Sequence, residues 1–394
     1  MRTVLSMNNI FEYSTKELLQ DAVICWCINW INYPDAVLCE LGKATLDLCL
    51  GENKQDRYYN VEVKYQYKKI DILVSFKGEK QGIRKKYVLI LEDKTNTSEH
   101  NGQIKRYCDL IKADGEYKEY DPFVTYIKTG IMYDIDYQTA KEVNTAIDID
   151  RLTEMLKQFL KKTNSEILHS FVEYLEKIRV NRADIKDKID SGYYEKCLGS
   201  AYGQFYFLDR IFSDRSKGSQ IAKTENNLPI YVDHIYAGKN NDGSSWTEYC
   251  FWCGEYLEQN DGKKEYNYIF WRIDEYSNKS GKNNEQSIAM RHYDENARSK
   301  TNEFKNQRKR EIYRKIRTRI TKIEDIYGIF QPIQGKENFK ESDLIFITAS
   351  KLHSIGDVNE VRKYLKELTN QVIGFMDEIV LEGSIITKHF KSKL

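Results

Sequence analysis

Residues 87–94 have the sequence Tyr-Val-Leu-Ile-Leu-Glu-Asp-Lys, in which a continuous apolar run is followed at once by three charged residues. A run of this kind predicts a strand that is buried on both faces of a sheet. Upstream, residues 69–76 have the sequence Lys-Ile-Asp-Ile-Leu-Val-Ser-Phe and predict the neighbouring strand. The pattern therefore places Asp71 on one strand and Glu92 and Lys94 at the end of the next.

The alternation of side chains along a strand sorts the charged residues by face. Glu92 and Lys94 lie two positions apart, so we expect both on one face, with Asp93 on the opposite face. Carboxylate oxygens are hard ligands that suit Mg²⁺, which polarises a phosphate and lowers the pKa of a bound water. A lysine beside them can stabilise charge on the phosphate. The alternative is a set of ordinary charged residues solvated at the strand ends.

Further periodic segments complete a first α/β domain. We expect an amphipathic helix with Gln103 and Tyr107 on one face, four residues apart. Ser14 and Glu17 have the spacing of a capping box at the start of the first helix. The predicted strands are 61–67, 69–76, 87–93 and 123–130, and the predicted helices are 14–31, 36–50, 99–112, 150–162 and 165–179.

The pattern changes after about residue 182, where Gly- and Asn-rich loops begin to separate the strands. We therefore expect two domains, residues 1–182 and an α+β domain over residues 183–394. The second domain is expected to have strands at 230–236, 246–257, 265–276, 286–293 and 344–348, and helices at 301–325 and 357–378.

Composition limits the class of protein. The 394 residues carry 61 Lys and Arg against 60 Asp and Glu, so any nucleic-acid binding must come from a local basic patch. We expect no secretory leader and no transmembrane span. Eight scattered cysteines without a leader are typical of reduced thiols, and a cytoplasmic location is expected.

Taken together, these motifs resemble the PD-(D/E)XK nuclease superfamily, in the bacterial branch whose Glu-x-Lys strand is followed by a helix with Gln-x-x-x-Tyr. The resemblance covers about residues 10–180 and departs at Ile70, where the family has its proline. It implies a restriction-endonuclease-like α-β-β-β-α-β core, in which a mixed sheet is flanked by helices. It also implies hydrolysis of phosphodiester bonds that depends on Mg²⁺ or Mn²⁺.

The resemblance also implies roles for individual residues. Asp71 and Glu92 would bind the metal, Lys94 would be the catalytic lysine, and Gln103 would assist it, with Tyr107 in support. Glu17 would be an additional metal ligand, because related nucleases carry a helical glutamate that faces the site. The capping box offers an equally complete explanation of Glu17.

The predicted helix at 301–325 is a candidate nucleic-acid contact. It combines an apolar stripe with a basic face, a combination that suits a phosphate backbone. The alternative is a solvated charged helix. The stripe consists of Ile312, Ile316, Ile320 and Ile323, and the basic face of Arg310, Arg314 and Arg317.

The leading hypothesis is a metal-dependent deoxyribonuclease, with DNA favoured over RNA as the substrate. The family resemblance suggests a role in bacterial defence or restriction. Cutting both strands with one site suggests a homodimer, and the second domain would select a substrate or respond to an activating ligand or partner. Two alternatives remain open: a nuclease fold that binds nucleic acid or protein without catalysis, and a nuclease directed at RNA.

Overall fold

The computed structural model describes residues 9, 11, 17–98, 102–217, 220–223, 229–241, 243–256, 266–274, 286–294, 303–329, 331–332, 341–381 and 385–387. The chain divides into two compact units, Met1–Asn181 and Arg182–Leu394, one residue before the expected domain boundary. Each unit is described by itself below.

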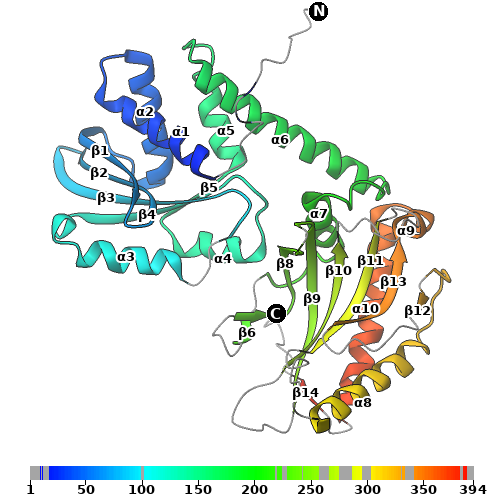
Figure 1. Cartoon of the computed structure of the whole chain (residues 1–394). Coiled ribbons are helices and arrows are strands. Elements are labelled where there is room, and N and C mark those ends of the chain that lie inside the picture. The colour runs from blue at the N-terminus through cyan, green and yellow to red at the C-terminus, as the bar shows by residue number, and fades with distance from the viewer. Residues whose placement is uncertain are drawn as a thin grey trace, which may run out of the picture. The chain divides into compact units, whose positions relative to one another are not determined.

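The first unit is α/β (Figure 1). Its elements begin with two helices, which are followed by three strands, a helix and a fourth strand. They are α1 (Glu17–Asn29), α2 (Ala36–Leu50), β1 (Arg57–Tyr67), β2 (Ile70–Lys80), β3 (Ile83–Lys94), α3 (Gln103–Ala113), β4 (Asp121–Lys128), α4 (Asp134–Glu142), β5 (Thr145–Asp148), α5 (Ile149–Lys157) and α6 (Glu166–Asp190), the last of which continues past the boundary.

The strands of this unit form a mixed sheet in the order β1-β2-β3-β4-β5 within the described residues. β1, β2 and β3 are antiparallel, whereas β4 and β5 run parallel to β3. Ile72 pairs with Leu91, and extending this register by one residue brings Asp71 across from Glu92. The strand pairing alone therefore puts the two predicted ligands side by side.

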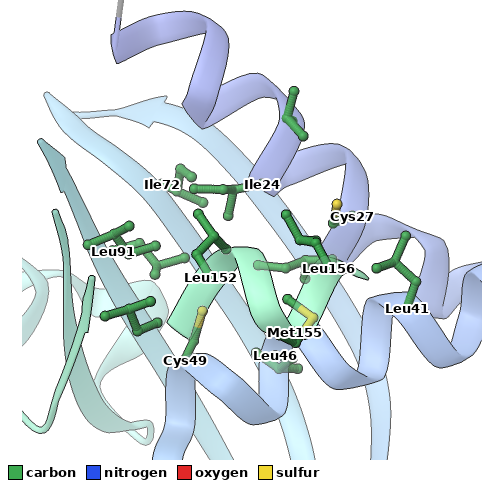
Figure 2. Packing of buried hydrophobic residues seen from close by; sticks show 14 of the residues in the cluster. Ile24, Cys27, Leu41, Leu46, Cys49, Ile72, Leu91, Leu152, Met155 and Leu156 are labelled. Atoms are coloured by element: carbon green, nitrogen blue, oxygen red, sulfur yellow. The ribbon is translucent and has the colours of Figure 1, made fainter. Parts of the chain in front are cut away.

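Strand β3 is buried on both faces, as its apolar run predicts. Leu89 and Leu91 belong to a core cluster with α1, α2, α5 and α6 (Figure 2). Val88 and Ile90 belong to a second cluster on the opposite face, together with Tyr107 of α3. The helices on both sides hold β3 in place, and its charged end lies at the margin of these two cores.

Two parts of this unit differ from the expected segments. Strand β1 begins at Arg57 and not at residue 61, and the register shifts between Tyr59 and Glu62. Asn60 has a positive φ of 51° there, so a local irregularity interrupts the alternation by which a strand is recognised. Helix α4 and strand β5 were not predicted, and β5, with 4 residues, is too short for an alternation to be recognised.

The second unit contains a larger antiparallel sheet. In the described residues its order is β12-β13-β11-β10-β9-β14, with β8 paired to β9, while β6 and β7 form a separate pair. Trp271 in β10 donates to Thr369 in α10 at 2.8 Å, which places α10 on one face of the sheet (Figure 1). Its strands are β6 (Gln220–Lys223), β7 (Pro229–Tyr231), β8 (His234–Lys239), β9 (Ser245–Tyr256), β10 (Tyr266–Asp274), β11 (Ser287–Asp294), β12 (Gln331–Pro332), β13 (Glu341–Thr348) and β14 (Ile385–Thr387), and its helices are α7 (Ala201–Ile211), α8 (Glu303–Ile320), α9 (Ala349–Ile355) and α10 (Val358–Leu381).

Most predicted segments of this unit have a counterpart, with shifted ends. The expected helix 301–325 is α8, which ends at Ile320, and the expected strand at 230–236 is divided between β7 and β8. Helix α7 was not predicted. Among the described residues, no helix is both long enough and apolar enough to span a membrane.

Candidate active site

The ammonium group of Lys94 lies among three carboxylates at the ends of β2 and β3. Lys94 Nζ is 2.5 Å from Glu92 Oε1, 3.4 Å from Asp71 Oδ2 and 3.6 Å from Glu17 Oε1. These are the residues that the sequence pattern and the resemblance single out, and they come from β2, β3 and α1. The structure thus brings the predicted lysine and all three predicted ligands together.

Backbone hydrogen bonds fix two of these carboxylates. Asp71 Oδ2 accepts from the backbone N–H of Asp93 at 3.2 Å, and Glu17 Oε1 accepts from that of Thr95 at 3.3 Å. Glu17 is the first residue of the helix, and Ser14 lies outside the described residues. The side chain of Glu17 therefore faces the site, as a helical ligand would.

The third carboxylate, Glu92, is fully buried. Its relative exposure is 0%, and Oε2 has no hydrogen-bond partner among the described residues. Burial raises the pKa of Glu92 to about 8, against the attraction of Lys94 and together with the repulsion of Asp71. A buried carboxylate with an unsatisfied oxygen is costly unless a cation or a proton neutralises it.

Lys94 supplies part of that neutralisation. Its relative exposure is 5%. Burial alone would lower its pKa, but Glu92, then Asp71 and Glu17, outweigh burial and raise it. The lysine therefore stays protonated over the physiological range and places a fixed positive charge at the ends of the strands.

Asp93 points to the opposite face of β3, as the alternation predicts. Its Oδ1 accepts from Gln20 Nε2 of α1 at 2.6 Å, and Gln20 Oε1 accepts from the hydroxyl of Thr129 at 2.8 Å. The Thr129 N–H donates to the Lys94 carbonyl at 3.2 Å. The Gln20 side chain thus links α1 to the ends of both β3 and β4.

The chain leaves β3 and β4 through a tightly packed region. Gly130 follows Thr129, and a Cβ there would overlap the carbonyl oxygen of Thr95, so only glycine fits. Lys128, the last residue of β4, donates to the Thr97 carbonyl and lies 3.6 Å from Asp136. These contacts hold the segment after Lys94 against β4.

Asp21 is the site residue that the sequence analysis missed. It lies one helical turn after Glu17, has a relative exposure of 0%, and neither carboxylate oxygen has a hydrogen-bond partner within the described part of the chain. Burial, then the charge of Asp71, raises its pKa. The available signal was the Glu17–Asp21 spacing of four residues, which puts both on one face of α1.

Gln103 and Tyr107 form a pair on α3. Gln103 Nε2 donates to the Tyr107 hydroxyl at 2.7 Å, and that hydroxyl donates to the carbonyl of Lys69, just before β2. Tyr107 is buried and its pKa is raised by burial, with smaller effects from Glu92 and Asp71. The pair therefore anchors α3 beside the strand that carries Asp71.

The donor groups suit a hard divalent cation, since Asp71, Glu92 and Glu17 offer carboxylate oxygens and Glu92 Oε2 is buried without a partner. In the described ranges, no group of three or more Asp, Glu, His or Cys side chains is already arranged around a metal position. The ammonium of Lys94 lies between the three carboxylates instead. Binding of a cation by Asp71 and Glu92 would require Lys94 Nζ to move away from Glu92.

The predicted basic face lies on α8 in the second unit. Arg314 is exposed, and the half-buried Arg317 has its guanidinium 5.6 Å from the ring centre of Tyr313. Arg310 belongs to α8, but its side chain lies outside the described residues. The expected apolar stripe is buried at Ile312, Ile316 and Ile320. Ile323 is half-buried and follows the end of the helix.

No protein-family model, curated protein or solved structure matches this chain. Its function must therefore be inferred from the residues and geometry described above.

Proposed function

We propose that this protein is a metal-dependent nuclease with a restriction-endonuclease-like core of the PD-(D/E)XK type, and that it hydrolyses phosphodiester bonds in DNA. The observation that carries the proposal is the position of Lys94 Nζ, within 4 Å of carboxylates from β2, β3 and α1. The order of helices and strands, with β3 antiparallel to β2 and parallel to β4, agrees with such a core.

Asp71 and Glu92 would hold Mg²⁺ or Mn²⁺, with Glu17 as a third ligand from α1. When bound, the cation would polarise the scissile phosphate and make a water more acidic. Lys94 would place its positive charge against the phosphate as negative charge develops. Tyr107 and Gln103 would hold α3 against the start of β2, so that Asp71 stays opposite Glu92.

DNA is proposed over RNA on the family resemblance, and the basic face of α8 would supply phosphate contacts in the second unit. The exposed Arg314 and the half-buried Arg317 are the described side chains that fit this role. Contacts of this kind position a nucleic acid without reading its sequence.

The test is a cleavage assay on the full chain. Plasmid, linear double-stranded DNA, single-stranded DNA and RNA are each incubated with Mg²⁺, Mn²⁺ or EDTA. We expect DNA cleavage with either cation and none in EDTA. Cleavage of RNA alone would replace the proposed substrate. Binding of DNA without cleavage under all conditions would favour a nuclease fold that serves as a binding module.

A further inference from the structure

The sheet of the first unit has an exposed basic surface at the end away from the active site, on the face that carries α3. Alternation from Leu73 and Val88 of the α3-side core places the outer residues of β2 and β3 on this face. The register then pairs Tyr59 of β1 with Lys77, and Lys77 with Lys86. We call this region the open face, and its residues are Arg57, Tyr59, Lys77, Arg84, Lys86 and Tyr120.

Two lysines stand directly opposite each other on the open face. Lys77 of β2 is the antiparallel partner of Lys86 of β3, and like charges at such positions destabilise a sheet. Glu119 lies 2.5 Å from Lys86, whereas Lys77 is exposed and has no ion pair or hydrogen bond within the described residues. An anion bound between the two lysines would relieve their repulsion.

Tyrosine rings support two cations of the open face. The Arg84 guanidinium lies 4.6 Å from the ring centre of Tyr59, and Lys86 Nζ lies 5.6 Å from that of Tyr120. Arg84 Nε also donates to Glu79 at 2.5 Å, and its Nη2 donates to the Tyr59 hydroxyl at 3.3 Å. These contacts fix the guanidinium and leave its Nη1 hydrogens for a further acceptor, an arrangement that suits a phosphate.

The charge of the open face is positive. Its cations are Arg57, Lys77, Arg84 and Lys86, and the acids paired with them are Glu79 and Glu119, which leaves a net charge of +2. At its border, Lys64 is paired with Glu62 and Glu116, which lowers this sum to +1. The whole chain also carries only +1, so the positive charge here is a local feature of the kind that attracts a polyanion.

Helix α3 runs beside the sheet between the active site and the open face (Figure 1). Tyr107 of α3 donates to the Lys69 carbonyl just before β2, and Tyr120, after α3, lies beside Lys86. The exposed charged residues of α3 are Lys105, Arg106, Asp109 and Lys112, which add a net +2. Positive charge therefore continues along α3 from the active site to the open face.

The strand geometry gives the separation between the two regions. Lys77 follows Asp71 by six residues in β2, which corresponds to about 20 Å along a strand. Duplex DNA rises about 3.4 Å per base pair, so this separation spans about six base pairs.

We propose that the open face binds backbone phosphates of duplex DNA about six base pairs from the scissile bond. This inference rests on the proposed function, because it extends the substrate of the same site. Phosphate contacts of this kind add affinity and fix the position of the duplex without reading its sequence.

The first experiment measures duplex binding without cleavage. The full-length protein is titrated in EDTA into a fluorescent DNA duplex at several salt concentrations, and binding is followed by anisotropy. The double change Lys77→Gln and Lys86→Gln should reduce the slope of log K against log salt by about 2. The matched control, Lys80→Gln with Lys85→Gln, removes two exposed charges from the opposite face of the same strands and should keep the wild-type slope.

A cleavage measurement tests the distance. With Mg²⁺, the Lys77→Gln and Lys86→Gln change should raise KM for a long duplex and leave kcat unaltered, because it removes binding that does not change in the transition state. A duplex of about 8 base pairs is too short to lie across the active site and the open face when cut near its middle. For that duplex, the variant and the wild type should have the same KM.

A thermal measurement verifies that the variant is folded. At low salt, Lys77→Gln should unfold at a higher temperature than the wild type, because it removes the repulsion between Lys77 and Lys86. The difference should disappear in high salt, which screens exposed charges. A lower unfolding temperature would show that the lysines do not repel each other and would remove the reason for an anion between them.

The outcomes distinguish the open face from the proposed function. A slope for the Lys77 and Lys86 variant as steep as that of its control would overturn the open-face proposal, and so would a wild type that does not bind the duplex. A wild type that binds DNA through these lysines but cuts none with Mg²⁺ or Mn²⁺ would support the surface and contradict the proposed nuclease.

Discussion

Replacement of Glu92 by glutamine is expected to stabilise the metal-free protein increasingly as the pH rises. Burial raises the pKa of Glu92 from an ordinary 4.5 to about 8. The folded state therefore binds the proton more tightly than the unfolded state. The stability that this proton contributes is fully present below about pH 4.5 and is lost as the pH rises through 8.

The magnitude follows from the two pKa values. The interval between 4.5 and 8 means that the wild type loses about 5 kcal/mol of unfolding free energy by pH 9. About 1 kcal/mol of this is already lost at pH 5. Glutamine has nearly the same shape and cannot ionise, so it avoids this loss. Lys94 keeps Asp71 and Glu17 as partners in the variant. The buried amide adds an offset that does not depend on pH.

The assay is urea unfolding of the full chain in EDTA, followed by circular dichroism between pH 5 and pH 9. The advantage of Glu92→Gln over the wild type should grow by about 4 kcal/mol across this range. Glu62→Gln, at an exposed position of β1, is the matched control for the loss of a carboxylate, and the growth with pH should be specific to Glu92→Gln. A difference for Glu92→Gln that stays constant, or that shrinks with pH, would refute the reasoning.

Three other variants test the supporting contacts. Gln20→Leu leaves Asp93 Oδ1 without its donor and should cost about 2–3 kcal/mol of unfolding free energy in EDTA, whereas an unchanged value would show that the link is dispensable. Tyr107→Phe removes the hydroxyl that joins α3 to β2 and should cost about 1–2 kcal/mol. The double change Arg314→Ala and Arg317→Ala should weaken DNA binding and reduce the slope of log K against log salt by about 2. An unaltered slope would show that these side chains of α8 do not contact DNA phosphates.

The part of the site on β2 and β3 could be predicted because it follows from local rules. The apolar run before Glu92 predicts a strand buried on both faces, and alternation then sorts Glu92 and Lys94 from Asp93. Antiparallel pairing of neighbouring strands brings Asp71 to Glu92. Each of these steps needs only the assignment of a strand and of the strand next to it in the sequence.

The contribution of α1 could be predicted only in part. Asp21 lies in a helix, where an aspartate commonly faces solvent, and nothing local shows that it is buried. It is buried because α1 packs across the end of β3, about 70 residues later in the chain. Sequence periodicity reports on local segments only and does not reveal contacts over such a separation. The bond between Gln20 and Thr129 spans an even longer separation. Such residues become visible only when the tertiary packing is known.

Segment ends were the least predictable feature of the fold. Strand β1 begins before its alternation becomes regular, because the positive φ of Asn60 interrupts the pattern. Helix α8 ends at Ile320, although the basic sequence continues to Lys322. Short elements such as β5 carry too few residues for a period to be recognised.

The most direct test of the central claim is single-turnover cleavage of linear double-stranded DNA in Mg²⁺ by the wild type, Lys94→Met and Glu92→Gln, with Glu62→Gln as the control. If the charged side chains at the ends of β2 and β3 catalyse phosphodiester hydrolysis, the wild type and the control should cleave at the same rate. The two site variants should be slower by at least about 100-fold. Equal cleavage by all four proteins, or cleavage that persists in EDTA, would contradict the account.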